Sequence, residues 1–186
     1  KDVNGMRAQL RVDAKKIAPV PDLGWDISHA RRLVQVLDAV ELNRSALQTW
    51  YSLVPAELPA SDLSRDFAAQ LVTTVWNGDM RHPLFSNYWS GANGWYRVAY
   101  DDGTAGCRAG IGPYGLSSSF ATGGYATWAR YYPLIGELAR TVYAASLSAD
   151  TTDRAYVDKY LPGLSASASA SNRMLNQLMF WPSLVQ

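Results

Sequence analysis

The sequence predicts a mainly α fold, either a helical bundle or a partial α/α toroid, with one long aromatic- and glycine-rich insertion that carries a small β-hairpin. Apolar residues recur every three to four positions in both halves of the chain, which is the period of an amphipathic helix. Between the halves, residues 79–124 hold most of the fourteen glycines and show no helical period. We therefore expect one domain, residues 1–186, with a helical scaffold of residues 1–78 and 125–186 around the insertion.

Four helices are expected before the insertion. The first covers residues 5–18 and ends at a pair of prolines. The second covers residues 26–43, with Asp26 as its N-cap and an apolar stripe on one face. A short helix over residues 46–54 follows, and a third clear helix over residues 61–76 ends at an Asn-Gly pair.

The insertion has the pattern of a short hairpin. Residues 95–100 alternate and are rich in aromatic side chains, residues 101–103 have the composition of a turn, and residues 106–111 form the returning strand. In a strand, Trp95 and Arg97 point to one face and Tyr96 to the other.

Helix resumes after the insertion. We expect helices over residues 125–146, with an adjustment at Pro133, then over residues 152–161 and residues 172–181. The helical spacing predicts a common set of buried side chains, namely Leu33, Leu37, Phe67, Leu71, Val75, Leu134, Leu138 and Val142.

Composition excludes several classes of protein. Hydrophobic residues make up 48% of the 186 residues, which is enough for a packed core and rules out general disorder. The net charge of +1 provides no basic surface for nucleic acid, and the longest uncharged stretch is too polar to span a membrane. Because the chain begins at Lys1 rather than Met, removal of an export signal is conceivable, and we expect a secreted or periplasmic location. The oligomeric state stays open.

The familiar motifs for cofactors and metals are missing. The sequence has no phosphate-binding P-loop, no dinucleotide-binding glycine motif between a strand and a helix, and no C-x-x-C pair. His29 and His82 are the two histidines, and neither has a clustered partner with metal-ligand spacing. We therefore expect no cofactor and no metal.

The first candidate for chemistry is the start of the second helix. Asp26 and His29 are three residues apart, so they share one face of that helix. The pair is compatible with a histidine held by a carboxylate and available as a base. A capping aspartate beside an ordinary, half-buried histidine is the structural alternative.

The second candidate is the run from Trp76 to Arg97, which combines tryptophan, tyrosine, asparagine and arginine. Sugar rings need flat apolar platforms for their C–H faces and fixed donors for their hydroxyls, and these residue types supply both. The alternative is a small satellite core in which Gly and Asn serve turns. A third candidate is the stretch after Gly123-Gly124, where Tyr125 and Trp128 share the first turn of a helix.

These features resemble parts of the helical-toroid enzymes that degrade polysaccharides, chiefly in the runs Ser86-Asn87-Tyr88-Trp89 and Asn93-Gly94-Trp95-Tyr96-Arg97. The match is one of residue type over about a quarter of the chain. In that family a Tyr or His abstracts the C5 proton of the sugar while Asn and Arg neutralise its carboxylate, or two carboxylates hydrolyse the bond. The resemblance implies a similar carbohydrate-active site here.

Our leading hypothesis is a glycan-active enzyme, lyase or hydrolase, with its site between helix N-termini and the insertion. The candidate catalytic residues are His82, Tyr96, Asp79 and Asp101, with Asp102 as an alternative to Asp101. The candidate residues for binding a carbohydrate or another small polar ligand are Asp26, His29, Asn87, Trp89, Asn93, Trp95, Arg97, Tyr125 and Trp128. A non-catalytic carbohydrate-binding or protein-interaction module, and a thiol enzyme using Cys107 with His82, are the alternatives.

Overall fold

The computed structural model describes residues 23–98 and 110–180, and the protein is mainly helical, with helices covering 59% of the described residues. The mainly α prediction is confirmed. The predicted helix over residues 5–18, the turn over residues 101–103, Asp101 and Cys107 lie outside the described residues. The α-helices in the described residues are α1 (Ile27–Leu42), α2 (Arg44–Tyr51), α3 (Leu63–Gln70), α4 (Ser118–Thr122), α5 (Pro133–Leu147), α6 (Thr151–Tyr160) and α7 (Ala170–Phe180).

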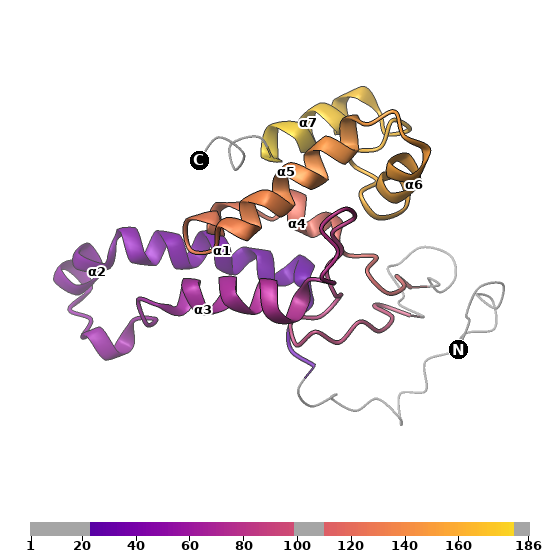
Figure 1. The fold of residues 1–186 in the computed structure, drawn as a ribbon. Helices are drawn as coiled ribbons and strands as arrows, with labels where there is room; N and C mark the ends of the chain where they lie inside the picture. Colours follow the sequence, from indigo (N-terminus) through magenta and orange to yellow (C-terminus); the bar gives the residue numbers. More distant parts are fainter. Residues whose placement is uncertain (1–22, 99–109, 181–186) are drawn as a thin grey trace, which may run out of the picture.

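The helices form two groups that meet at α4 and α5. Figure 1 shows α1 and α3 side by side as an arm, with α2 at the tip of the arm. At the other end of the molecule, α5 packs against α6, and α4 packs against α7. A 3₁₀ segment, Tyr125–Arg130, leads directly into α5 and packs against it and against α3.

Helix α1 forms because its cap and its apolar spacing agree. Asp26 accepts hydrogen bonds from the backbone N–H groups of Ser28 and His29, which satisfies donors that have no partner inside the helix. Ile27, Ala30, Val34 and Leu37 are then buried at intervals of three and four residues. The predicted N-cap and helix are confirmed.

The core is one cluster of buried side chains that runs from Ile27 to Phe180 in the sequence. Five of the predicted core positions, Leu37, Leu71, Val75, Leu138 and Val142, are buried. Leu33, Phe67 and Leu134 are half-buried instead. Leu33 and Phe67 remain accessible because they form part of the wall of a surface pocket.

The insertion contains isolated bridges and no named strand in its described part. Tyr96 and Ile111 pair antiparallel, through N–H to O=C bonds of 2.8 and 2.7 Å, and they represent the predicted hairpin. Helix begins again at Ser118, earlier than predicted, because Ser117 anchors this turn: its hydroxyl accepts from the Phe85 N–H at 2.9 Å. Gly124, with φ +79, separates this short helix from the 3₁₀ segment, which is why the sequence pattern suggested a start at residue 125.

Candidate functional site

Asp26 and His29 form a hydrogen-bonded pair at the N-terminus of α1. One carboxylate oxygen of Asp26 lies 2.6 Å from Nδ1 of His29, while the other accepts from the backbone N–H groups of Ser28 and His29 at 3.0 and 3.2 Å. An ionised carboxylate can only accept, so Nδ1 carries the hydrogen of this bond. In the neutral imidazole, the lone pair is therefore on Nε2.

The carboxylate of Asp26 remains ionised in this setting. Burial by itself would raise the pKa of Asp26, but hydrogen bonds from Ser28 and His29 and the charge of His29 outweigh that effect and lower the pKa. The Ser28 hydroxyl also donates to the Asp26 carboxylate. The pair is therefore held in one orientation over the neutral pH range.

This pair lines a surface cleft with a volume of about 620 Å³. The side chain of His29 is 38% exposed, whereas that of Asp26 is 11% exposed and lies behind it. Trp25, which is 58% exposed, stands at the cleft, and Arg32 and Tyr88 contribute to its walls. The cleft thus combines an accessible imidazole, a cation and an exposed indole.

Two tyrosines from the insertion extend this polar group. The rings of Tyr88 and Tyr96 are 6.3 Å apart, and Tyr88 forms an antiparallel bridge with Asp26. Burial, followed by the negative charge of Asp26, raises the pKa of both phenols. Both therefore carry their proton at neutral pH. The Tyr88 hydroxyl donates to the carbonyl of Trp95 at 3.1 Å, so its proton is committed to that bond.

The side chain of Arg97 lies over the ring of Tyr96 and does not share a face with Trp95 as predicted. Its backbone has φ +53, in the left-handed region, so the strand alternation ends there. Its guanidinium lies 5.0 Å from the centre of the Tyr96 ring. The predicted shared face of Trp95 and Arg97 is therefore replaced by a Tyr96–Arg97 pair, while half-buried Trp95 lies against Gly112.

Asn87 and Asn93 organise the loops of the insertion. Asn87 is completely buried, and its Nδ2 donates to the carbonyls of Gly94 and Gly112 at 2.9 and 2.8 Å. Oδ1 of Asn93 accepts from the N–H of Tyr114 at 2.7 Å. Both side chains hydrogen-bond to the backbone of the loops, and completely buried Asn87 offers no surface to a ligand. Asn93 is half-buried, and its contact with a ligand stays a prediction.

Trp89, Tyr125 and Trp128 form an aromatic cluster in the core. Tyr125 and Trp128 are completely buried, with ring centres 5.5 Å apart, and they present no surface to a ligand. The Tyr125 hydroxyl donates to the carbonyl of Ile27 at 2.6 Å, directly under the first turn of α1. Trp89, which is 5% exposed, reaches the wall of a second pocket.

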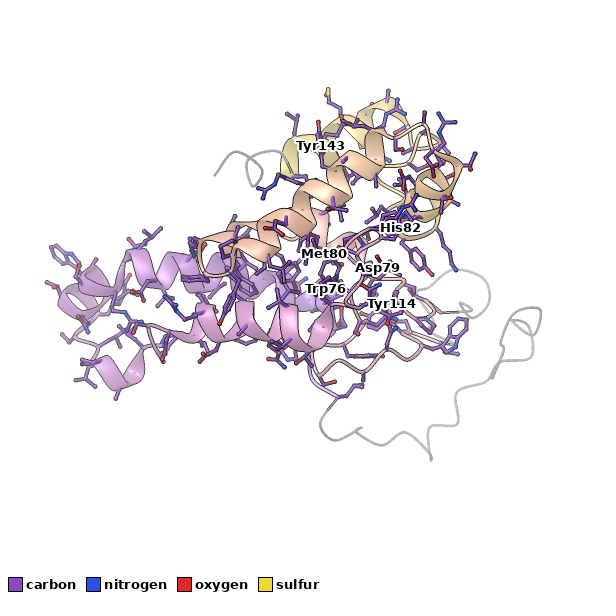
Figure 2. All side chains as sticks on the ribbon, in the orientation of Figure 1. Trp76, Asp79, Met80, His82, Tyr114 and Tyr143 are labelled. Atoms are coloured by element: carbon purple, nitrogen blue, oxygen red, sulfur yellow. The ribbon has the colours of Figure 1, made fainter. Side chains whose placement is uncertain are left out.

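His82 and Asp79 belong to a different cluster, close together on the side of the molecule where α6 lies (Figure 2). Nε2 of His82 lies 2.9 Å from a carboxylate oxygen of Asp153 on α6, and its ring is 4.9 Å from that of Tyr156. Backbone hydrogen bonds from His82 and Arg81 lower the pKa of Asp79. His82 fastens the loop to α6, while Asp79 accepts from the N–H groups of Arg81 and His82 within the loop. Neither residue is among those that line the Asp26–His29 cleft.

Sequence reasoning missed Arg32, Tyr88 and Trp25 as members of the cleft. A signal for Arg32 was present, because a residue three positions after His29 on a helix lies on the same face. Trp25 directly precedes Asp26 of the predicted pair in the sequence. Only the position of Tyr88 depends on a contact between distant parts of the chain, through its bridge to Asp26.

No family model, curated protein or solved structure matches this chain. Among residues 23–98 and 110–180, no three His, Cys, Asp or Glu side chains come close enough to hold a metal ion. None of the described helices combines the length and the apolar character needed to cross a membrane. The arrangement of the cleft is therefore the basis for inferring an activity.

Proposed function

We propose that this protein is a polysaccharide lyase that acts on uronic-acid units bound in the Asp26–His29 cleft. The observation that carries the proposal is the 2.6 Å contact between Asp26 and Nδ1 of His29, which leaves Nε2 as the basic atom of a half-exposed imidazole. A positioned base of this kind accelerates proton transfer. The ring of Tyr96 lies 6.3 Å from that of Tyr88, which lines the cleft. Burial, and then the negative charge of Asp26, raise the pKa of Tyr96, so its phenol is neutral and can donate a proton.

The reaction requires one base and one acid. Nε2 of His29 takes the proton from C5 of the uronate, and the electron pair of that C–H bond forms the C4=C5 double bond. The bond from C4 to the glycosidic oxygen breaks, and Tyr96 gives its proton to that oxygen. The products are an unsaturated uronate and a chain with a free hydroxyl, and exchange with water restores His29 and Tyr96.

Cations and an aromatic platform complete the proposed site. The substrate carboxylate needs positive charge beside it, because abstraction of the C5 proton spreads negative charge onto it. Arg32 lines the cleft, and Arg97 lies on the Tyr96 ring. Trp25 provides the flat apolar surface on which a sugar ring can stack.

The cleft favours elimination over hydrolysis. Glycoside hydrolases generally need two carboxyl groups on opposite sides of the scissile bond. Among the cleft-lining residues within 23–98 and 110–180, Asp26 is the one carboxylate, and it is occupied by the helix cap and by His29. The carboxylate pair of Asp79 and Asp101 proposed from the sequence has Asp79 in the other cluster.

The test is a screen of uronate-containing polysaccharides for the ultraviolet absorbance of the C4=C5 double bond. We expect turnover by the unmodified protein and a loss of about a hundredfold or more in His29→Asn. His82→Asn is the matched control, because it changes the other histidine, which lies outside the cleft. Loss of turnover in His82→Asn with His29→Asn fully active would overturn the assignment.

A carbohydrate-binding module is the second candidate, favoured by the 58% exposure of Trp25 beside the cleft. Stacking on an indole holds a sugar without any chemistry. In that case the protein binds the polysaccharide without producing unsaturated uronate. Binding then falls in Trp25→Ala and is unaffected by His29→Asn.

A further inference from the structure

A second pocket lies next to the Asp26–His29 cleft, and its character is different. It has a volume of about 490 Å³ and is bounded mainly by Leu63, Phe67 and Trp89. Gly24, Trp25 and Leu33 line both cavities, so the two share a wall. A molecule bound in one cavity is therefore adjacent to the other.

The polar side chains of this pocket are already hydrogen-bonded to the protein. Gln70 and Trp89 form two hydrogen bonds with each other. The indole Nε1 of Trp89 donates to Oε1 of Gln70 at 2.9 Å, and Nε2 of Gln70 donates to the backbone carbonyl of Trp89 at 3.1 Å. The Ser90 hydroxyl donates to the carbonyl of Leu23 at 2.6 Å. What these walls offer a ligand is apolar and aromatic surface, which suits an aryl or alkyl group better than the hydroxyls of a bare sugar.

We propose that this pocket binds an aryl or alkyl group carried by the substrate, while the sugar acid of the same molecule lies in the Asp26–His29 cleft. The proposal builds on the lyase function and specifies its substrate as an acidic glycan with an apolar substituent. Three observations support it: the shared wall at Trp25, a volume typical of small-molecule sites, and the aromatic surface of Phe67 and Trp89.

The experiment measures binding by calorimetry, so it does not depend on turnover. Methyl glucuronide tests the cleft alone, phenyl glucuronide tests the cleft and the pocket, and phenol tests the pocket alone. We expect phenyl glucuronide to bind about tenfold more tightly than methyl glucuronide, or better, because the phenyl group leaves water.

Leu63→Trp fills the pocket from its rim, and Leu47→Trp is the matched control. Both leucines are half-buried helix residues, but Leu63 lines the pocket whereas Leu47 is on α2 and lines neither cavity. We expect Leu63→Trp to remove the preference for the phenyl compound and to leave binding of methyl glucuronide unchanged. Leu47→Trp should keep the full preference.

The possible failures are distinguishable. Equal affinity for the phenyl and methyl compounds would overturn the pocket assignment and leave the cleft intact. Binding of phenol without any gain from the glucuronate would contradict the lyase function instead. Concentration-dependent dimerisation that Leu63→Trp abolishes, without ligand binding to the pocket, would show that a second copy of the chain covers this surface and would also overturn the proposal.

Discussion

Replacing Asp26 by asparagine separates the two functions of its carboxylate. Asparagine is as good an N-cap as aspartate, so it can still accept from the backbone N–H groups of Ser28 and His29. Its amide can also donate to Nδ1 of His29, which favours the tautomer with the hydrogen on Nε2. We therefore expect Asp26→Asn to retain most of its stability and to lose turnover by about a hundredfold or more.

Asp26→Ala removes both functions. The lost cap costs about 1 kcal/mol, and the lost hydrogen bond to His29 costs about 1 kcal/mol more, since water can reach the 38% exposed imidazole. Urea unfolding followed by circular dichroism should therefore show a loss near 2 kcal/mol for Asp26→Ala and well under half of that for Asp26→Asn. Equal losses in the two variants would refute the capping argument.

The same carboxylate makes stability depend on pH. The pKa of Asp26 is lowered below its ordinary value of 3.8 in the folded state, so its stabilising effect is fully present above that pH and disappears as pH falls through the folded pKa. Asp26→Asn should show a smaller decrease in the free energy of unfolding below about pH 4 than the unmodified protein. The paired arrangement would be contradicted if the free energy of unfolding of Asp26→Asn decreased below about pH 4 as much as that of the unmodified protein and turnover were normal.

Three further predictions concern the core, a close backbone contact and the cation of the site. Leu138→Ala should lower the free energy of unfolding by about 2–5 kcal/mol in urea titrations, whereas Leu147→Ala, at a 61% exposed position on α5, should change it by less than about 0.5 kcal/mol. Gly123→Ala should lower the melting temperature, because a Cβ there would lie 2.4 Å from the carbonyl oxygen of Ser119; Gly94→Ala, with open space around it, should not. Arg97→Lys should reduce turnover about tenfold with little change in melting temperature, because it keeps the charge but loses the planar fork.

The helices were predictable because their determinants are local. Helix α1 has its cap at Asp26 and its buried positions at regular spacing, all within one stretch of sequence. The same holds for α6, where Asp150 accepts from the N–H groups of Thr152 and Asp153. The Asp26–His29 pair was predictable for this reason as well, since residues three apart on a helix must lie together.

The rest of the site depends on contacts that spacing cannot reveal. The fold pairs His82 with Asp153, 71 residues away in the sequence, and this pair is not part of the Asp26–His29 cleft. The pattern around Arg97 predicts strand alternation, but the left-handed backbone at Arg97 places its guanidinium over the ring of Tyr96. The first contact joins distant parts of the chain, and the second follows from a backbone conformation that the strand pattern does not predict.

Aromatic and amide residues in a long loop can either bind a ligand or pack the loop itself, and composition does not distinguish these two functions. Asn87 satisfies the backbone of the insertion, and Tyr125 donates to the carbonyl of Ile27 across 98 residues of sequence. That bond and the ring packing beneath it fix the first turn of α1, where Asp26 and His29 are located. Tyr125 and Trp128 therefore act on the site through the position of α1, so shortening one of them should displace the Asp26–His29 pair even though neither lines the cleft or the second pocket.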